Sequence, residues 1–550
     1  MNTLKIGLLL DDKLSNTYIY DLADWAKKQN HVEISHIILC RPPPISGLFK
    51  IYNILKNMQL NCIASIILFK AIISLEKLML KFSKLHRCHF DAFDLGKKID
   101  GELIINRIMD EFSCRFSPGD VERVKSLNLD LIIQCNFEEI RGEIIHASRL
   151  GIISMNDRIG KIYPRHFSCF WETYYRMPKT SFGIQKLNDD IDVRETLVSG
   201  SFSTKYFFSL NQANLFRKSM PHLKNILKKT CLTGQLPATE INRPVCEKLL
   251  QPPKFYQCIF YLFKVIFRLA KKLFFHFANI QKKWTISFVN SNWNNAILSQ
   301  GISANAPRGH FWADPFVYAE GGKTYCFVED YVYRTNRGHI SVLEITENSV
   351  VQLGECIKES FHLSFPFLFK YENRLYMCPE SSESKKINIY RCKNFPFEWE
   401  LSSVAMENIS AADTVLFEHA GLWWMLTSID ESGSNDHCSE LYLFYSNSPL
   451  DSNWKAHPKN PIRIDTDGGR NAGLILENEK IFRLAQRQGY DQYGEGLLIY
   501  EITQISESTY SEKLISEIKP SFKNGLLGSH HLSTTGTITV FDHKSNSFFP

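Results

Sequence analysis

One short pattern recurs between Trp312 and His531 at intervals of roughly 50 to 60 residues, and it constrains the fold more than any other feature of the chain. Each copy consists of an apolar strand, a tight turn and a second apolar strand. The copies begin at Ala313, Ser364, Ala412 and Asn471, and a truncated fifth begins at His530. Repeats of this length built from short strands are typical of propeller blades. We therefore expect an all-β, five-bladed propeller over residues 284–550, closed by pairing of strands at Thr285–Asn290 and Thr537–Asp542.

The repeat also predicts the position of a site. In a blade the first strand leaves the axis and the second returns after the turn, so the start of one and the end of the other lie together near the axis. Acidic residues are depleted in strands, and their presence at equivalent strand ends indicates a polar pocket rather than turn caps, which are the alternative. The equivalent positions are Asp314, Phe365, Asp413, Ala472 and His531 in the first strand and Glu329, Glu380, Ser428 and Gln486 in the second, with Arg470, Asn471 and His530 beside them.

These residue types suit chemistry on sugars. Glycosidic bonds are made or cleaved around a pair of carboxyl groups, because the transition state needs a negative partner and an oxygen needs a proton. We expect Asp314, Asp413 and Glu380 to be catalytic. The residues expected to bind the substrate are Trp312, Glu329, Arg470, Asn471, Gln486, His530 and His531.

Two alternatives stay open for these residues. The aromatic side chains of the propeller can pack between blades instead of on a ligand, which we expect of Trp424 but not of Trp312. We assign no metal site; a divalent cation held by Asp314, Asp413, Glu380 and the histidine pair is the alternative, since Ca²⁺ and Mg²⁺ prefer oxygen ligands.

Bulk properties limit the remaining classes. At 550 residues, the chain is long enough for two or three domains. A formal net charge of +6 without an arginine-rich tract predicts no nucleic-acid partner. Fourteen cysteines without a CxxC pair indicate reduced thiols, and the first residues do not have the pattern of a signal peptide. We expect a cytoplasmic location, with or without membrane association.

Residues 1–205 have the pattern of an α/β domain. Apolar runs at Leu4–Leu10, Val32–Leu39, Asp130–Gln134 and Gly151–Met155 alternate with helical spacing at Thr17–Lys28 and Arg141–Leu150. Strands that alternate with helices predict a mostly parallel sheet. We expect a helical insertion near residues 48–85.

Residues 206–283 are predicted to be a helical connector. Between Tyr256 and Lys283, four basic residues lie at helical spacing on one face and phenylalanines occupy the rest: Lys264, Arg268, Lys271 and Lys272. This composition is typical of a helix on an anionic membrane surface. The alternative is an amphipathic helix packed between two domains, with its lysines solvated.

Part of the N-terminal region resembles a known family. Leu129–Ile133, Gly151–Asn156 and Ile191–Asp192 resemble the formyltransferase fold of the methionyl-tRNA, glycinamide-ribotide and sugar N-formyltransferases. In that family, a strand ends in Asn-x-His and a later loop supplies an Asp. This chain has Ser154 and Asn156 at the first two positions and Asp192 at the third. The resemblance implies a formyltransferase-like domain with a second, altered site at these residues and a folate formyl donor as its cofactor.

A second resemblance covers the propeller. The motifs at Ala313–Phe316, Cys378–Ser381, Ala412–Thr414, Arg470–Gly473 and His530–Ser533 resemble, in order, the N-terminal propeller of plant glucosamine inositolphosphorylceramide transferases and their bacterial relatives. The first blade also resembles five-bladed propellers of the arabinanase and xylosidase type. That likeness implies a base at Asp314 and an acid-tuning role for Asp413. The fourth-blade Glu that serves as general acid there is replaced here by Asn471 and Gln486.

The sequence therefore predicts a carbohydrate-active transferase of bacterial surface-glycan biosynthesis. Its expected partners are a sugar nucleotide or a lipid-linked glycan and, through the helix at 256–283, an anionic membrane surface. Glycosyl transfer is favoured over formyl transfer and over glycoside hydrolysis. Two alternatives remain: a non-catalytic glycan-binding propeller that positions substrate for a partner enzyme, and an amino-sugar N-formyltransferase with an altered active site.

Overall fold

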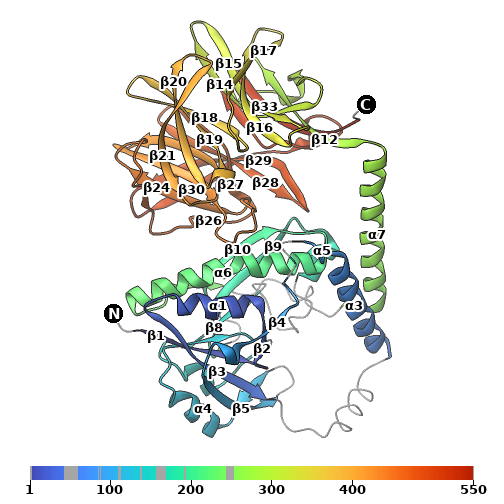
Figure 1. Ribbon diagram of the computed structural model, residues 1–550, viewed down its shortest axis with the longest axis vertical. Helices are drawn as coiled ribbons and strands as arrows, with labels where there is room; N and C mark the ends of the chain where they lie inside the picture. Colours follow the sequence, from blue (N-terminus) through green and yellow to red (C-terminus); the bar gives the residue numbers. More distant parts are fainter. Residues whose placement is uncertain are drawn as a thin grey trace. The chain divides into compact units, whose positions relative to one another are not determined.

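The chain divides into two compact units, Met1–Leu269 and Ala270–Pro550 (Figure 1). The computed structural model describes residues 3–41, 60–83, 86, 88–109, 113–136, 139–156, 169–190, 194–242 and 253–548.

The first unit is built on a nine-stranded sheet. Its central strands are parallel and its edge strands are antiparallel, so the sheet is mixed rather than mostly parallel as predicted. Strands β9 and β10 are antiparallel neighbours in this sheet, which the pattern of alternating strands and helices did not predict. In sheet order, the strands are β11 (Glu240–Asn242), β10 (Arg194–Ser203), β9 (Lys179–Lys186), β8 (Ile152–Asn156), β7 (Leu131–Gln134), β1 (Leu4–Leu10), β3 (Val32–Arg41), β5 (Gly101–Met109) and β6 (Cys114–Phe116).

The helices of this unit begin and end where the sequence gives local signals. Helix α1 (Thr17–Lys27) begins after Asn16, whose side chain accepts a hydrogen bond from the amide of Ile19 and caps the first turn. The segment expected to be helical at 141–150 contains only a short 3-10 helix, Glu143–His146, because Gly142 with φ +82 interrupts it. The other helices are α3 (Leu60–Met79), α4 (Pro118–Lys125), α5 (Phe170–Tyr175), α6 (Phe208–Thr233) and α7 (Phe255–Phe277), and β2 (Leu14–Asn16) pairs with β4 (Ala92–Asp94).

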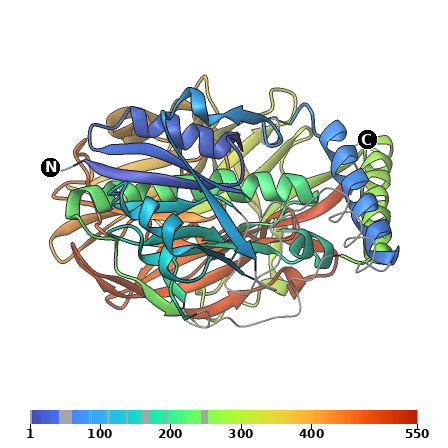
Figure 2. The same ribbon diagram turned by 90° about the horizontal axis from the view of Figure 1, so that it is seen from below.

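Helix α3 occupies the described part of the predicted insertion at 48–85, and α7 lies in the predicted connector. Tyr261 and Cys258 of α7 pack with Phe69 and Ile72 of α3 in one apolar cluster. Figure 2 shows the two helices side by side, α3 in blue and α7 in green. Among the described residues, no helix is both long and apolar enough to cross a bilayer.

The second unit is a five-bladed propeller, as predicted. Each of its five sheets in the described residues is one blade (Figure 1). Blade one holds β14 (His310–Glu320), β15 (Lys323–Val332), β16 (Arg337–Ile345) and β17 (Val350–Ile357), and blade two holds β18 (Ser364–Tyr371), β19 (Arg374–Glu380), β20 (Lys386–Asn394) and β21 (Glu398–Glu407). Blade three holds β22 (Ala411–His419), β23 (Leu422–Ile429), β24 (Glu440–Ser446), β25 (Lys455–Ala456) and β26 (Arg463–Ile464).

The remaining two blades complete the ring. Blade four holds β27 (Asp467–Glu477), β28 (Lys480–Gly489), β29 (Gln492–Ile505) and β30 (Tyr510–Ile518). Blade five holds β12 (Ile280–Val289), β13 (Ile302–Ala304), β31 (Leu526–Gly528), β32 (Leu532–Thr534) and β33 (Thr539–Phe548). Strands β12 and β33 pair in antiparallel register from Ile280↔Phe548 to Val289↔Thr539, so the predicted closure of the ring by the two ends of the repeat region is confirmed.

A bulge recurs at the same place in the first strand of four blades. The pairing register shifts after Ala313, Ser364, Ala412 and Asn471. In three of these bulges a residue with a side chain adopts a left-handed backbone: Asp314 at φ +49, Phe365 at +45 and Asp413 at +49. Such conformations cost free energy and persist only where the surroundings enforce them. The bulges thus repeat one backbone feature around the ring.

In the fourth blade, the bulge uses a glycine. Gly473 has φ +123, and a Cβ added there would lie 2.9 Å from the carbonyl oxygen of Leu532. We expect Gly473→Ala to destabilise the propeller by about 2–4 kcal/mol, through backbone strain and this overlap. Gly421→Ala is the control, since its φ is +75 but nothing lies within 4 Å of the added Cβ; we expect about 1 kcal/mol there. Calorimetry of the two variants checks the difference, and equal shifts would contradict this account of the bulge.

Candidate functional site

Five acidic side chains from four blades share one electrostatic environment at the inner ends of the strands. Each influences the ionisation of others in the group, and all are buried or nearly so. Four of them were predicted from the repeat. The five are Asp314, Glu329, Glu380, Asp413 and Asp542.

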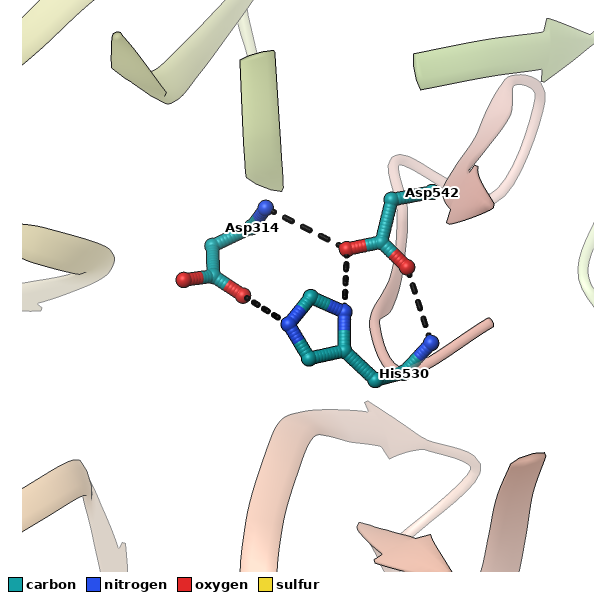
Figure 3. A group of neighbouring side chains, drawn as sticks. All are labelled: Asp314, His530 and Asp542. Carbon is teal, nitrogen blue, oxygen red and sulfur yellow. Dashed lines mark hydrogen bonds and ion pairs between the residues drawn. The ribbon is translucent and has the colours of Figure 1, made fainter. Parts of the chain in front are cut away.

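Asp314, His530 and Asp542 form a chain of polar contacts (Figure 3). Asp542 Oδ2 lies 2.6 Å from His530 Nδ1, and His530 Nε2 lies 3.5 Å from Asp314 Oδ1. The amides of His530 and His531 both donate to Asp542 Oδ1, at 2.8 and 3.0 Å. The indole of Trp284 stacks on the imidazole of His530 with ring centroids 3.9 Å apart. The imidazole of His530 thus lies between the carboxyl groups of Asp314 and Asp542, with one ring nitrogen facing each.

The carboxyl groups of Asp314 and Asp542 have opposite pKa shifts. Burial raises the pKa of Asp314 to about 6, although the nearby His530 opposes the shift. Burial also acts on Asp542, but His530 and the hydrogen bonds from the backbone hold the pKa of that carboxyl below its ordinary value. Asp542 is therefore a permanent carboxylate, and Asp314 titrates near neutral pH. Carboxyl groups with such separated pKa values are the usual basis of acid–base assignments.

Arg470 ties together two other carboxylates. Its Nε lies 2.6 Å from Asp413 Oδ2, and its Nη2 lies 3.1 Å from Asp413 Oδ1 and 2.9 Å from Glu380 Oε2. The guanidinium also lies over the ring of Tyr493, 5.1 Å from its centroid. Burial acts to raise the pKa of Glu380, but Arg470 outweighs it and lowers that pKa to about 2. Glu380 therefore keeps its charge at neutral pH.

Glu329 is a carboxyl group of this site that favours the protonated form. Burial and the neighbouring carboxylates, Asp314 first among them, raise its pKa well above the ordinary value. Its Oε1 lies 3.5 Å from Nε2 of His362. His362 Nδ1 accepts a hydrogen bond from the amide of Gly338 at 2.8 Å, so the proton of a neutral His362 is on Nε2 and faces Glu329.

The two amides predicted to bind substrate engage Asp413. Gln486 Nε2 donates to Asp413 Oδ2 at 2.9 Å. Asn471 Nδ2 donates to the backbone oxygens of Asp413 and Leu426, at 2.8 and 3.0 Å, and its Oδ1 accepts from Arg483. Gln486 thus helps to orient a pocket carboxylate, whereas Asn471 joins the third and fourth blades.

The aromatic and imidazole predictions have different outcomes. Trp424 is in the core of the blades, as expected. Trp312, predicted to contact substrate, instead packs in an apolar cluster with Ile286 and Phe288, because it lies before the bulge that redirects Asp314. His531 is completely buried against the edges of Phe316 and Phe365, and burial lowers its pKa to about 3, so the ring is neutral.

Asp314, His530 and Asp542 are also the one group of His, Cys, Asp and Glu residues, among those the structure describes, whose potential ligand atoms all lie within 4.8 Å of one another. Asp542 and His530 are already paired with each other, with Oδ2 of the first 2.6 Å from Nδ1 of the second. Calcium needs six to eight oxygen ligands, and Arg470 already occupies Asp413 and Glu380. The geometry therefore suits a proton relay better than a cation.

The second predicted site lies in the first unit. Ser154 is a buried residue of β8, beside Gln134 of β7 in the parallel pairing. Asn156 is the last residue of β8, and its side chain lies outside the described residues, as does Asp192. The structure thus places only one member of this group.

Four residues in contact with the predicted site residues were not expected from the sequence: Trp284, His362, Tyr493 and Asp542. Asp542 had a usable signal. In the first three blades, a site position follows a paired residue of the second strand by two residues. These paired residues are Phe327, Cys378 and Leu426, whose partners in the first strand are Phe316, Phe367 and Val415. In blade five the pairing Ser533↔Val540 puts Asp542 at that position, equivalent to Glu329 and Glu380.

Comparison with known proteins bears on the second unit. Residues 276–531 match the family model described as glucosamine inositolphosphorylceramide transferase 1, N-terminal. The protein of that name from Oryza sativa subsp. japonica is 36% identical over 208 residues, which cover 37% of this chain and 28% of that protein. The one from Arabidopsis thaliana is 34% identical over 224 residues, covering 40% and 29%. The match thus spans less than a third of the length of these curated relatives.

Solved structures with likeness to this chain are more distant. A family 117 glycoside hydrolase of Zobellia galactanivorans is 10% identical, over 48% of this chain and 91% of that one, with a TM-score of 0.31. An α-L-arabinanase of Penicillium chrysogenum is 12% identical, over 46% and 79%, with a TM-score of 0.30. From the sequence match and the five blades together, the second unit is a propeller that resembles the N-terminal part of the glucosamine inositolphosphorylceramide transferases.

Proposed function

We propose that the propeller pocket is the sugar site of a carbohydrate-active transferase that acts on an activated or lipid-linked sugar. The observation that carries this proposal is the chain Asp314–His530–Asp542, in which a carboxyl group of pKa about 6 faces an imidazole held by a carboxylate. A general base is most effective when its pKa lies near the working pH. Asp314 has that property.

In the proposed reaction, Asp314 accepts the proton of an acceptor hydroxyl while the hydroxyl oxygen attacks the anomeric carbon. The bond from that carbon to the leaving group breaks, and the leaving group takes the electron pair. The transition state has oxocarbenium character, which nearby negative charge stabilises. Glu380, whose pKa is about 2, supplies that charge, and Arg470 fixes its position beside Asp413. The proton on Asp314 can then be shared with His530, whose other nitrogen faces Asp542.

The composition of the site also supports a sugar substrate. The site holds five carboxyl groups and one arginine, and carboxyl groups bind hydroxyl and ammonium donors rather than phosphate. The relatives' name specifies glucosamine as the sugar and inositolphosphorylceramide as its acceptor. We propose the same chemical classes here: an amino sugar or related sugar, and a lipid-linked acceptor. A role in bacterial surface-glycan synthesis, at the cytoplasmic side, is part of the same proposal.

Glycoside hydrolysis has less support from the pocket. The propeller enzymes of the arabinanase type use a fourth-blade Glu as general acid. Here Asn471 and Gln486 occupy that blade and donate hydrogen bonds to Asp413. An amide cannot protonate a leaving oxygen.

A non-catalytic propeller that binds a glycan for a partner enzyme is the second candidate. It is favoured by the extent of the match, because the family model describes only the N-terminal part of those transferases and the chain covers 28% of the rice protein. N-formyl transfer by a formyltransferase-like first unit is a third hypothesis. It requires Ser154, Asn156 and Asp192 to replace the Asn, His and Asp of that family.

The candidates differ in one assay. The full chain is incubated with labelled UDP-N-acetylglucosamine or UDP-glucosamine and vesicles containing inositolphosphorylceramide, and the lipids are separated and counted. Label in the lipid fraction supports transfer. Retention of the sugar without transfer supports the binding propeller, and incorporation of a formyl group from a labelled folate donor supports the third hypothesis. No retention and no transfer would contradict the sugar site.

The pKa of Asp314 gives the transfer a pH dependence. A base must be unprotonated to act, so the rate is expected to fall as the pH falls through about 6, tenfold for each pH unit below it. An unperturbed aspartate would give this fall near pH 4. The rate measured from pH 4 to 8 at saturating substrate checks the shift, and a flat profile across pH 6 would contradict the role of Asp314 as the base.

A further inference from the structure

The outer faces of helices α3 and α7 expose many apolar side chains. Helix α7 turns Cys258, Tyr261 and Val265 inward, at positions i, i+3 and i+7. The opposite face exposes large apolar side chains to solvent over the whole length of the helix. They are Tyr256, Ile259, Phe260, Phe263, Ile266, Phe267, Leu273, Phe274 and Phe277.

Helix α3 extends the same surface. It exposes Ile67 and Leu78, with 63% and 71% of their surface accessible, and Phe82 follows the helix with 91% exposed. Because Phe69 and Ile72 of α3 pack with the inward face of α7, the two exposed faces belong to one structural element. An apolar patch of this extent is costly in water and marks a surface that another phase or molecule covers.

The charges around this surface have one sign. Residues 253–283 contain no Asp or Glu, and residues 60–83 contain only Glu76. Glu76 is buried: it accepts hydrogen bonds from the amide of Ser209 at 2.8 Å and from the hydroxyl of Tyr261. It therefore fixes both helices to α6 and adds no charge outside. The exposed charged residues of the two segments are lysines, including Lys70, Lys77, Lys81, Lys254, Lys271 and Lys272.

We propose that the joint outer face of α3 and α7 docks on an anionic phospholipid bilayer, with the aromatic side chains in the headgroup region and the lysines at the phosphates. Aromatic rings and lysine stems are the side chains that suit this interface. Helix α7, of 23 residues, is about 34 Å long, so it can lie flat along the surface. Neither helix is apolar enough to span the bilayer, which fits an interfacial position. The proposal does not depend on the reaction proposed above.

Vesicle flotation with the full chain tests this surface. We expect binding to phosphatidylcholine vesicles that contain phosphatidylserine, weaker binding to phosphatidylcholine alone, and release as the salt concentration rises. Lys271→Gln with Lys272→Gln should weaken binding to the anionic vesicles about 30-fold. Phe260→Gln, Phe263→Gln and Phe267→Gln combined should weaken it roughly a hundredfold or more.

A matched control distinguishes binding through this surface from nonspecific binding through other exposed apolar side chains. Phe397→Gln with Leu401→Gln removes two exposed apolar side chains from the propeller, one directly before β21 and one within it. Their surfaces are 45% and 54% accessible, and the change should leave vesicle binding unchanged. All substitutions lie on exposed positions, so circular dichroism and thermal melting should match the parent chain. The proposal is overturned if the chain does not bind anionic vesicles, or if the triple variant binds as well as the parent. It is also overturned if the parent is a dimer that the triple variant dissociates, since a second copy would then cover the face.

Discussion

Replacement of Asp314 by Asn is expected to lower the rate of sugar transfer by about a hundredfold to ten-thousandfold. Asn keeps the shape and hydrogen-bonding capacity of the side chain but cannot accept a proton. It also tolerates the left-handed backbone at this position, where φ is +49, so the bulge survives the change. Transfer at saturating substrate is the measurement, together with glucosamine binding by calorimetry, which should weaken only modestly.

Asp330→Asn is the matched control for that substitution. Asp330 is a buried carboxylate in the same blade, adjacent to Glu329 on β15 but on the opposite face of the strand, where it pairs with His310 and Ser341. Transfer by this variant should stay within a few-fold of the parent. If Asp314→Asn removes binding as completely as transfer, the pocket is a binding site, and the catalytic role of Asp314 is wrong.

Replacement of Arg470 by Met should destabilise the propeller by about 3–5 kcal/mol. The change removes the cation that pairs with two buried carboxyl groups, Asp413 and Glu380, and leaves both without their main partner. It should also raise the pKa of Glu380 from about 2, because Arg470 is the group that lowers it. Calorimetry measures the shift, and the transition that Gly473→Ala also lowers identifies the propeller.

Arg391→Met is the comparison for Arg470. Arg391 pairs with Glu400 in blade two, but about a third of each side chain is exposed, so water can replace the lost partner. The expected cost is below about 1 kcal/mol. Similar losses of stability for the two arginines would show that the ion pairs of Arg470 stabilise the propeller no more than an exposed ion pair does.

The repeat explains why much of the pocket was predictable. Equivalent positions in a propeller occupy equivalent places around the axis, so the columns of the repeat brought Asp314, Glu329, Glu380 and Asp413 together without any knowledge of their contacts. Asp542 was missed because its blade is built from both ends of the propeller region, β12 and β33, and the truncated fifth copy was not continued to its second strand.

Other errors have local physical causes. The bulge at Ala313–Phe316 changes the direction of successive side chains, so Trp312 enters the core although its neighbour enters the pocket. Spacing in α7 predicted an amphipathic helix but not its partner, because the bond from Tyr261 to Glu76 joins residues 185 positions apart. In the first unit, apolar runs predicted the central strands; the antiparallel edge depends on the pairing of β9 with β10, which the runs do not show.

In the function proposed above, the reaction takes place at Asp314 in the propeller. We would compare glycolipids and surface glycans by mass spectrometry in the parent organism, a deletion strain, and deletion strains that carry the wild-type, Asp314→Asn or Asp330→Asn chain at equal levels. We expect the deletion and Asp314→Asn strains to lack the same sugar substituent, and the Asp330→Asn chain to restore it. Restoration by the Asp314→Asn chain would contradict the claim and assign the chemistry to another site or to a partner.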